Sequence, residues 1–195
     1  MAAGAKKPPD EPIPTLPISI AIAPDDAPPA DGEAPKPVRD DAWIDAQIAA
    51  AERLFGAHGI HFARSETRPL DARFTHLETR ADRDALARHL AKGMINVFVV
   101  GSLRDVDDTT RMRMGVHWRP KAQLSRHYVI VSSTALATTL AHELGHFFGN
   151  GHTDVVNNVM SYTRTSDDVF LDERQVDTSL KFARMYVRTR ELRKP

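Results

Sequence analysis

One eleven-residue segment, H-E-x-x-H-x-x-G-x-x-H, constrains this chain more than any other feature of its sequence. His142 and His146 are four residues apart, so on an α-helix both imidazoles lie on one face and can reach one metal ion. Glu143 lies off that axis and is free to hold a water on the metal without binding the metal itself. Gly149 can adopt the positive φ that ends a helix, and the turn brings His152 back as a third ligand. Three protein ligands and one open position are typical of a catalytic zinc site.

The alternative interpretation is an ordinary helix that carries two surface histidines and ends at a glycine. A five-residue match to H-E-x-x-H arises by chance in roughly one window in 10⁴. The further requirement for Gly149 and His152 makes a chance match rarer by a factor of several hundred, on the order expected for two extra fixed positions. The zinc interpretation is therefore favoured.

A second motif, Val159-Met160-Ser161-Tyr162, follows a few residues after the third histidine. The extended zinc motif followed by a methionine turn is the metzincin signature, and the chain resembles that clan of zinc endopeptidases. The Met-Ser-Tyr form is similar to that of serralysins and astacins. The resemblance implies that Met160 forms an apolar floor beneath the histidines, and that Tyr162 either ligates zinc or swings away to stabilise the oxyanion. The simpler alternatives are core packing for Met160 and a half-buried ring for Tyr162.

One position departs from the best-known metzincin families, which differ in the residue after the third histidine. This residue is Thr153 here, and not the Ser, Glu, Pro or Asp of those families. The resemblance therefore reaches the clan and leaves the family within it unassigned.

The composition excludes several other classes of protein. A chain of 195 residues with 26 basic and 26 acidic side chains gives no reason to expect nucleic acid or an anionic membrane as a partner. No apolar run is long enough to span a bilayer, and the first residues show no apolar core of a signal peptide. The resemblance nevertheless favours a secreted protein. The absence of cysteine excludes disulfides and a cysteine-based latency switch.

The sequence predicts one domain with short tails. Residues 1–15 are rich in proline and charge and are expected to be disordered. Residues 16–190 are expected to form the zinc protease domain, with a proline-rich loop at 24–39 and a tail at 191–195.

Hydrophobic periodicity predicts an α/β (α+β) arrangement of alternating strands and helices. Leu136, Leu140 and Leu144 are expected to face the core from the zinc helix, which Ser132, Ser133 or Thr134 would cap. The polar stretch 64–80 is left unassigned, and the Asp-rich stretch 101–113 is expected to be a solvated loop without defensible calcium-binding spacing. The predicted strands cover residues 16–23, 59–63, 94–100, 114–118 and 128–131, and the predicted helices cover 40–55, 80–91, about 132–149 and 172–187.

The metzincin resemblance implies a twisted, mostly parallel sheet with one antiparallel edge strand, a zinc helix and a C-terminal helix. By position the edge strand is 114–118, and Gly115, Val116 and His117 would bind substrate main chain to main chain. His117 is the one remaining histidine with an expected place at the site. The others lack ligand spacing, namely His58, His61, His76, His89 and His127.

The resulting hypothesis is a zinc endopeptidase, a monomer that acts on proteins or peptides without nucleic acid or membrane. Its one catalytic Zn²⁺ would be held by His142, His146 and His152, and Glu143 would activate the zinc-bound water. Two alternatives remain open. One is a catalytically silent zinc module that holds a partner strand. The other is a narrow-specificity or latent protease in which an acidic segment occupies the zinc, through Asp25, Asp26 or Asp31.

Overall fold

The computed structural model describes residues 11–29, 31–166 and 168–193, so most of the predicted disordered tail lies outside the described residues. The chain forms strands and helices in a mixed order, with two 3-10 turns, η1 and η2, among them. The elements are β1 (Leu16–Ile22), α1 (Asp41–Gly56), β2 (Phe62–Pro69), η1 (Ala72–Phe74), β3 (His76–Leu77), α2 (Arg80–Ala85), η2 (Leu86–His89), β4 (Ile95–Val100), β5 (Ser102–Leu103), β6 (Gly115–Trp118), β7 (Tyr128–Ser132), α3 (Thr139–Phe147) and α4 (Glu173–Arg188).

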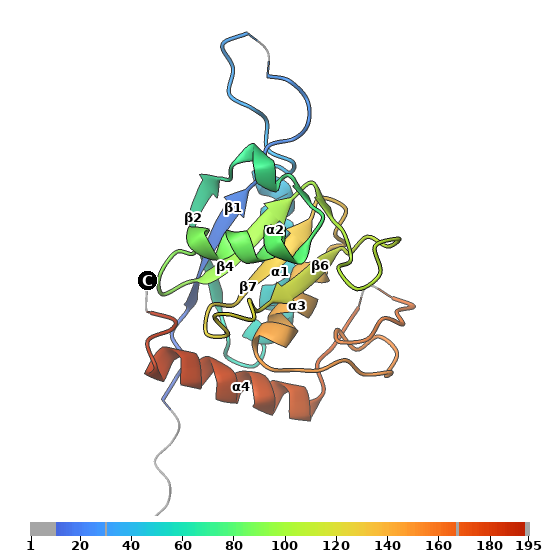
Figure 1. Ribbon diagram of the computed structural model, residues 1–195. Helices are drawn as coiled ribbons and strands as arrows, with labels where there is room; N and C mark the ends of the chain where they lie inside the picture. The colour runs from blue at the N-terminus through green and yellow to red at the C-terminus, as the bar shows by residue number, and fades with distance from the viewer. Residues whose placement is uncertain (1–10, 30, 167, 194–195) are drawn as a thin grey trace, which may run out of the picture.

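A five-stranded sheet in the order β2-β1-β4-β7-β6 forms the centre of the molecule (Figure 1). The first four strands are parallel, whereas β6 runs antiparallel to β7 and pairs His117 with Val129. Strands β1, β4 and β7 are fully buried, and they match the strands predicted over 16–23, 94–100 and 128–131. The predicted fold class, with one antiparallel edge strand, is confirmed.

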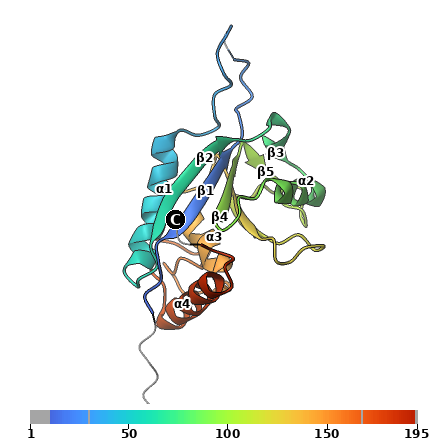
Figure 2. The ribbon, with the colours of Figure 1, turned by 90° about the vertical axis from the view of Figure 1, so that its left-hand side faces the viewer.

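Helices cover both faces of this sheet (Figure 2). Alternate residues of the central strands, such as Ile18 and Val97, pack on one side with α1, α3 and α4. Their neighbours, such as Phe98 and Ile130, pack on the other side with α2 and the small β3–β5 pair. Since strand side chains alternate between faces, each central strand contributes to both cores. The zinc motif lies on α3 and therefore on the larger core.

Two predicted boundaries were wrong. The second strand does not stop near residue 63 but continues as β2 through part of the stretch left unassigned. It is the outer strand next to β1, and its polar side chains are held by charge pairs instead of apolar burial: Arg64 contacts both Asp41 and Asp45 of α1. The predicted helix over 80–91 is α-helical only to Ala85 and continues as a 3-10 turn.

The start of the zinc helix also differs from the prediction. The helix begins at Thr139, and no side chain of its own cap bonds to its first turn. Gln47 of α1 takes that role: its Oε1 accepts from the Leu140 N–H at 3.1 Å and its Nε2 donates to the Leu136 carbonyl at 2.8 Å. Leu136 precedes the helix and is 59% exposed, so its predicted place in the core was wrong. A cap from a distant helix cannot be seen in the local sequence.

Leu192 and Arg193, which the sequence places in a tail, contact the domain. Leu192 is buried in the larger core, and the Arg193 N–H donates to the Gly93 carbonyl at 2.9 Å. Among the described residues, no helix has the length and apolar character needed to cross a membrane.

We expect Gln47→Met to lower the free energy of unfolding by about 2 kcal/mol, because the Leu140 N–H loses its buried acceptor and the Leu136 carbonyl loses its donor. Urea denaturation of the purified variant measures this change. Gln123→Met is the matched control, since Gln123 is exposed and its side chain has no recorded contact. Equal stabilities for the parent and Gln47→Met would show that this contact does not hold α3.

Candidate metal centre

Helix α3 and the turn after it bring the three predicted ligands together. Gly149 has φ +86°, and the main chain turns out of the helix there, as predicted. The Asn150 N–H then donates to the Gly145 carbonyl at 2.9 Å. The Nε2 atom of His146 lies 3.1 Å from that of His142 and 3.0 Å from that of His152. The three histidines thus form a group that can hold one metal ion.

The geometry of this group fits zinc. Four ligands about 2.05 Å from a tetrahedral zinc lie about 3.3 Å from one another, close to the two observed separations. The outer nitrogens are occupied by main-chain carbonyls: His142 Nδ1 lies 2.7 Å from the Val159 oxygen, and His146 Nδ1 lies 2.8 Å from the Asn150 oxygen. Donation from Nδ1 leaves the lone pair on Nε2, facing the shared centre.

Burial keeps these imidazoles neutral. Burial, together with the charges of His146, His152 and Arg164, lowers the pKa of His142 to about 4, although the contact with the Val159 carbonyl opposes this shift. Burial also lowers the pKa of His146 and of His152. Neutral imidazole is the form that binds a metal ion, so the site is ready for one at neutral pH.

The loop after α3 is fixed by the C-terminal helix. Asn150 Nδ2 donates to Ser179 Oγ at 2.8 Å, and Asn158 Nδ2 donates to Gln175 Oε1 at 2.8 Å. All four side chains are buried. Helix α4 therefore holds the two segments whose carbonyls orient the histidines.

Met160 lies directly beneath the zinc helix, fully buried. A Cβ atom on Gly145 would come within 2.2 Å of the Met160 sulfur, so only glycine lets the helix approach the methionine this closely. The Asn158 side chain fixes this turn by accepting from the Met160 N–H at 2.9 Å. This position is compatible with the apolar floor that the metzincin resemblance implies.

Tyr162 lies at the surface beside the histidines. Its ring centroid is 4.5 Å from that of His152 and 6.0 Å from that of His142, and the residue is 71% exposed. The half-buried alternative for this tyrosine was wrong. An exposed ring next to the ligands has room to move toward or away from the centre.

Glu143 is buried next to the edge strand. A Cβ atom on Gly115 would lie 2.9 Å from the Glu143 carboxylate, so the absence of a side chain there lets β6 pack against the carboxylate. Burial raises the pKa of Glu143 to about 8, although a main-chain contact with His117 and the charge of Arg113 oppose this rise. The carboxyl group can thus hold or release a proton near neutral pH.

A cleft of 780 Å³ joins these groups to solvent. Its walls include β6, the loop before it, the start of α3 and the residues after Met160. The cleft contains Glu143, the three histidines and Tyr162, together with the predicted strand residues Gly115, Val116 and His117.

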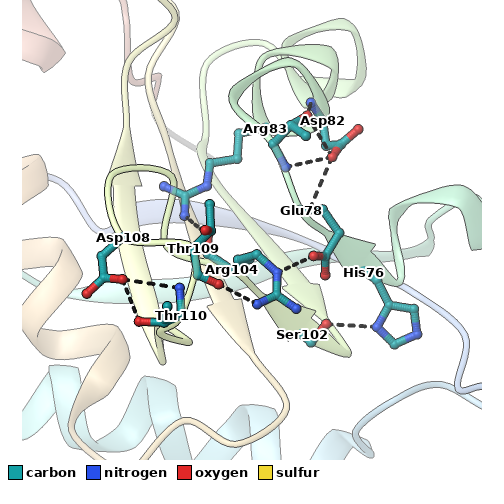
Figure 3. Close-up of polar contacts among 10 residues, drawn as sticks. His76, Glu78, Asp82, Arg83, Ser102, Arg104, Asp108, Thr109 and Thr110 are labelled. Carbon is teal, nitrogen blue, oxygen red and sulfur yellow. Dashed lines mark hydrogen bonds and ion pairs between the residues drawn. The ribbon is translucent and has the colours of Figure 1, made fainter.

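In the Asp-rich loop before β6, residues 107–112 are exposed as predicted, whereas Asp105 is buried, which corrects the prediction at that residue. Asp105 is buried and paired with Arg113, and its Oδ1 accepts from the Asp107 and Asp108 N–H groups. Figure 3 shows how the rest of the loop is held: Arg104 contacts both Glu78 and the Thr109 carbonyl. Both oxygens of this buried carboxylate therefore accept hydrogen bonds from within the loop and from Arg113.

Three groups near the cleft were missed or passed over by the sequence analysis. Arg113 and Arg164 line the cleft, although nothing in their sequence context indicates a role. His127 connects His117 to the chain end: its Nδ1 lies 2.7 Å from His117 Nε2, and its Nε2 lies 2.5 Å from a Glu191 oxygen. Burial lowers the pKa of His117 to about 2, with the charge of His127 adding to the effect.

The acidic segment of the latent alternative does not reach this cleft. Asp26 contacts His76 at 2.8 Å, and Asp25 accepts from the Ala27 N–H. Both lie in the loop between β1 and α1, which projects from one end of the molecule (Figure 1). Neither these two residues nor Asp31 is among the residues that line the cleft.

At the level of sequence, no family model and no curated protein matches this chain. Among solved structures, it is similar to metalloproteinase-II from Bacteroides fragilis, with a TM-score of 0.55 at 16% identity. The chain has the fold of a metalloproteinase. The superposition covers 87% of this chain and 53% of the other, so this chain spans about half the length of that protein.

We expect the purified chain to bind one zinc ion and to melt at a higher temperature with it. Free zinc at about 1,000 times its dissociation constant stabilises the folded state by about 4 kcal/mol. His142→Ala should lose both the bound metal and the thermal shift, whereas His58→Ala, at an exposed position outside the group, should keep both. Elemental analysis and calorimetry measure these changes. Stoichiometric zinc in His142→Ala would contradict the ligand set.

We expect Asp105→Asn to destabilise the fold at neutral pH by on the order of 2 kcal/mol, because the buried acceptor of Arg113 loses its charge. Hydrogen bonds from the main chain of Asp107, and then those from Asp108 and Arg113, hold the Asp105 pKa at about 2 against burial. Because this pKa is depressed, the ionised Asp105 side chain stabilises the fold at pH values above its ordinary pKa near 3.8. That contribution is lost as the pH falls toward 2. Melting curves should therefore converge for parent and variant in acid.

Asp177→Asn, at an exposed position of α4, is the control for this pH series and should follow the parent throughout. A constant difference between parent and Asp105→Asn from pH 7 to pH 2 would contradict the assignment of the depressed pKa to Asp105.

Proposed function

We propose that this chain is a zinc-dependent endopeptidase of the metzincin type. One observation carries the proposal: three neutral imidazoles converge on one centre, and a buried carboxylate that can exchange protons near neutral pH lies beside them in an open cleft. The fold shared with a metalloproteinase supports the same class of enzyme.

The metzincin type is supported by the methionine beneath the zinc helix. The extended zinc motif alone is compatible with other zinc enzymes, but Met160 packs against Gly145 directly under the ligands. Thr153 differs from the residue at this position in the best-known families, so the proposal names the clan only.

In this mechanism, zinc supplies Lewis-acid chemistry when bound, lowering the pKa of water and polarising the substrate carbonyl. Glu143 takes a proton from the attacking water while the water oxygen bonds to the carbonyl carbon. The carboxyl group then gives that proton to the leaving nitrogen as the carbon–nitrogen bond breaks, which regenerates the carboxylate. Its raised pKa suits both roles, since general acid–base catalysis works best near the operating pH.

Tyr162 is proposed as a second stabilising group for the developing oxyanion. Its ring lies beside His152 and is free of the core, so the phenol hydroxyl can approach the reacting oxygen and donate a hydrogen bond to it.

The proposed substrate is a protein or peptide bound in extended form by a monomer of this chain. Strand β6 is at the edge of the sheet and pairs only with β7 among the described strands. An unpaired edge offers main-chain donors and acceptors to an added strand. Gly115, Val116 and His117 would make these contacts next to Glu143.

We expect the zinc-loaded parent to cleave peptides in a quenched-fluorescent library, and Glu143→Ala to keep zinc but lose at least about a thousandfold in turnover, since it lacks the proton-transfer group. Elemental analysis of the variant serves as the control for the metal. Cleavage products identified by mass spectrometry locate the bond that is cut.

Full activity of Glu143→Ala would exclude the proposed base. A zinc-loaded parent that binds extended peptides without cutting any would instead support a silent module that holds a partner strand.

A further inference from the structure

His127, just before β7, is buried among the zinc helix, the edge strand and the C-terminal helix. Its ring stacks on that of Phe147 with the centroids 4.3 Å apart, and it lies 5.4 Å from the ring of Tyr186. Both of its nitrogens also meet a polar side chain: Nδ1 lies 2.7 Å from His117 Nε2, and Nε2 lies 2.5 Å from a Glu191 oxygen. This imidazole therefore links β6 to the end of the chain.

The chemistry of the partners sets the direction of these two hydrogen bonds. An ionised carboxylate only accepts, so His127 Nε2 carries a proton and donates to Glu191. A neutral His127 then has its lone pair on Nδ1, where it accepts from His117 Nε2–H. Burial keeps His117 neutral, because it lowers the pKa of that ring to about 2. Glu191 thus determines which nitrogen of each ring carries the proton.

The main chain after α4 adopts an unusual conformation that brings Glu191 to this histidine. Arg190 has φ +62°, a left-handed conformation that is uncommon for a residue with a side chain. The Leu192 N–H donates to the Tyr186 carbonyl at 3.1 Å, and the Leu192 side chain is buried in the larger core. A strained conformation persists where the surrounding contacts compensate for it. The buried leucine and the contact between Glu191 and His127 supply such contacts here.

The other end of this network reaches Glu143. The main chain of His117 contacts the Glu143 carboxylate. The Met114 carbonyl accepts from a β7 N–H at 2.8 Å, so Met114 and, two residues later, Val116 face β7. The N–H of His117 therefore faces away from β7, where it can donate to the carboxylate. His117 is thus held at two points, by its side chain within the network and by its main chain next to Glu143.

We propose that Glu191 and His127 are positioning residues for Glu143. Glu191 fixes His127, His127 fixes the His117 side chain, and the main chain of His117 holds the Glu143 carboxylate in place. This inference rests on the proposed peptidase function and adds two residues that are not among those lining the cleft. The competing interpretation is a buried network that stabilises the fold and has no effect on catalysis.

Two substitutions of His127 separate these interpretations. His127→Phe keeps a ring against Phe147 but loses both hydrogen bonds, whereas His127→Asn keeps an amide oxygen that can accept from His117 in place of Nδ1. We expect kcat per bound zinc to fall by about tenfold to a hundredfold in His127→Phe, because small displacements of a reacting group cost this much. KM should stay close to that of the parent, and His127→Asn should recover part of kcat.

An unchanged kcat per bound zinc in His127→Phe would overturn the proposal. A raised KM at unchanged kcat would overturn it as well, since the network would then act on substrate pairing with β6. Equal losses in His127→Phe and His127→Asn would exclude the contact with His117 as the cause.

The carboxylate end of the network is tested by Glu191→Ala. This variant should lower kcat as His127→Phe does, and the double variant should fall no further, because residues that act as one unit are not additive. Glu33→Ala, at an exposed glutamate of the 24–39 loop, is the matched control and should keep the kcat of the parent. Additive losses in the double variant would show that Glu191 and His127 do not act through one network.

Amide hydrogen exchange, measured by NMR on the zinc-loaded protein, tests the network without hydrolysis. We expect the His117 N–H to exchange at least about tenfold faster in Glu191→Ala than in the parent, because a loosened contact opens more often. The Val116 N–H faces β7 and is the internal control, which should exchange as in the parent. Glu143→Ala removes the acceptor and gives the exchange rate of the His117 N–H without this contact.

These exchange rates separate the inference from the proposed function. Faster exchange at His117 alone supports the network even if the parent cleaves no peptide. Unchanged exchange at His117 would overturn it even if the parent is an active peptidase. Equal acceleration at Val116 would also overturn it, since β6 as a whole would then have loosened.

Discussion

Three imidazole nitrogens that converge within about 3 Å repel one another unless a cation lies between them, and the rest of the structure serves to hold them there. The helix fixes only the spacing of His142 and His146. Their orientation comes from two main-chain carbonyls in the following loop, and that loop is fixed by buried amide contacts with α4. The geometry of a site encoded within eleven residues therefore depends on a helix that begins about twenty residues later.

Two glycines, Gly145 in α3 and Gly115 in β6, determine how close the neighbours of the zinc helix come. The Met160 sulfur occupies the space that a side chain at Gly145 would need. The Glu143 carboxylate likewise occupies the space that a side chain at Gly115 would need. The zinc helix is thus enclosed between Met160 and β6 without intervening side chains. This close packing explains both the burial of Glu143 and the proximity of the edge strand to the metal centre, because a Cβ atom at either glycine would force these elements apart.

The sequence was most informative where a pattern repeats or a motif is contiguous. Hydrophobic patterns predicted the strands β1, β4 and β7 and the helix over 172–187, where α4 lies. The prediction failed where a polar side chain acts on a distant segment. Gln47 caps a helix more than ninety residues away, and Arg113 is held by a buried aspartate that composition marks as solvated. Neither contact has a local signature, because the local sequence does not distinguish a buried polar residue from an exposed one when its partner is distant.

The charges around the cleft show why these distant contacts matter for chemistry. Four arginines line it with three carboxylates, and two of those carboxylates, Asp105 and Asp107, are already held in ion pairs. A metal ion on the three neutral histidines would add further positive charge. Charges held in a partly buried cleft act more strongly than they would in water. The cleft as a whole would therefore stabilise an anion beside the metal centre, such as the one that the proposed attack on a substrate carbonyl would form.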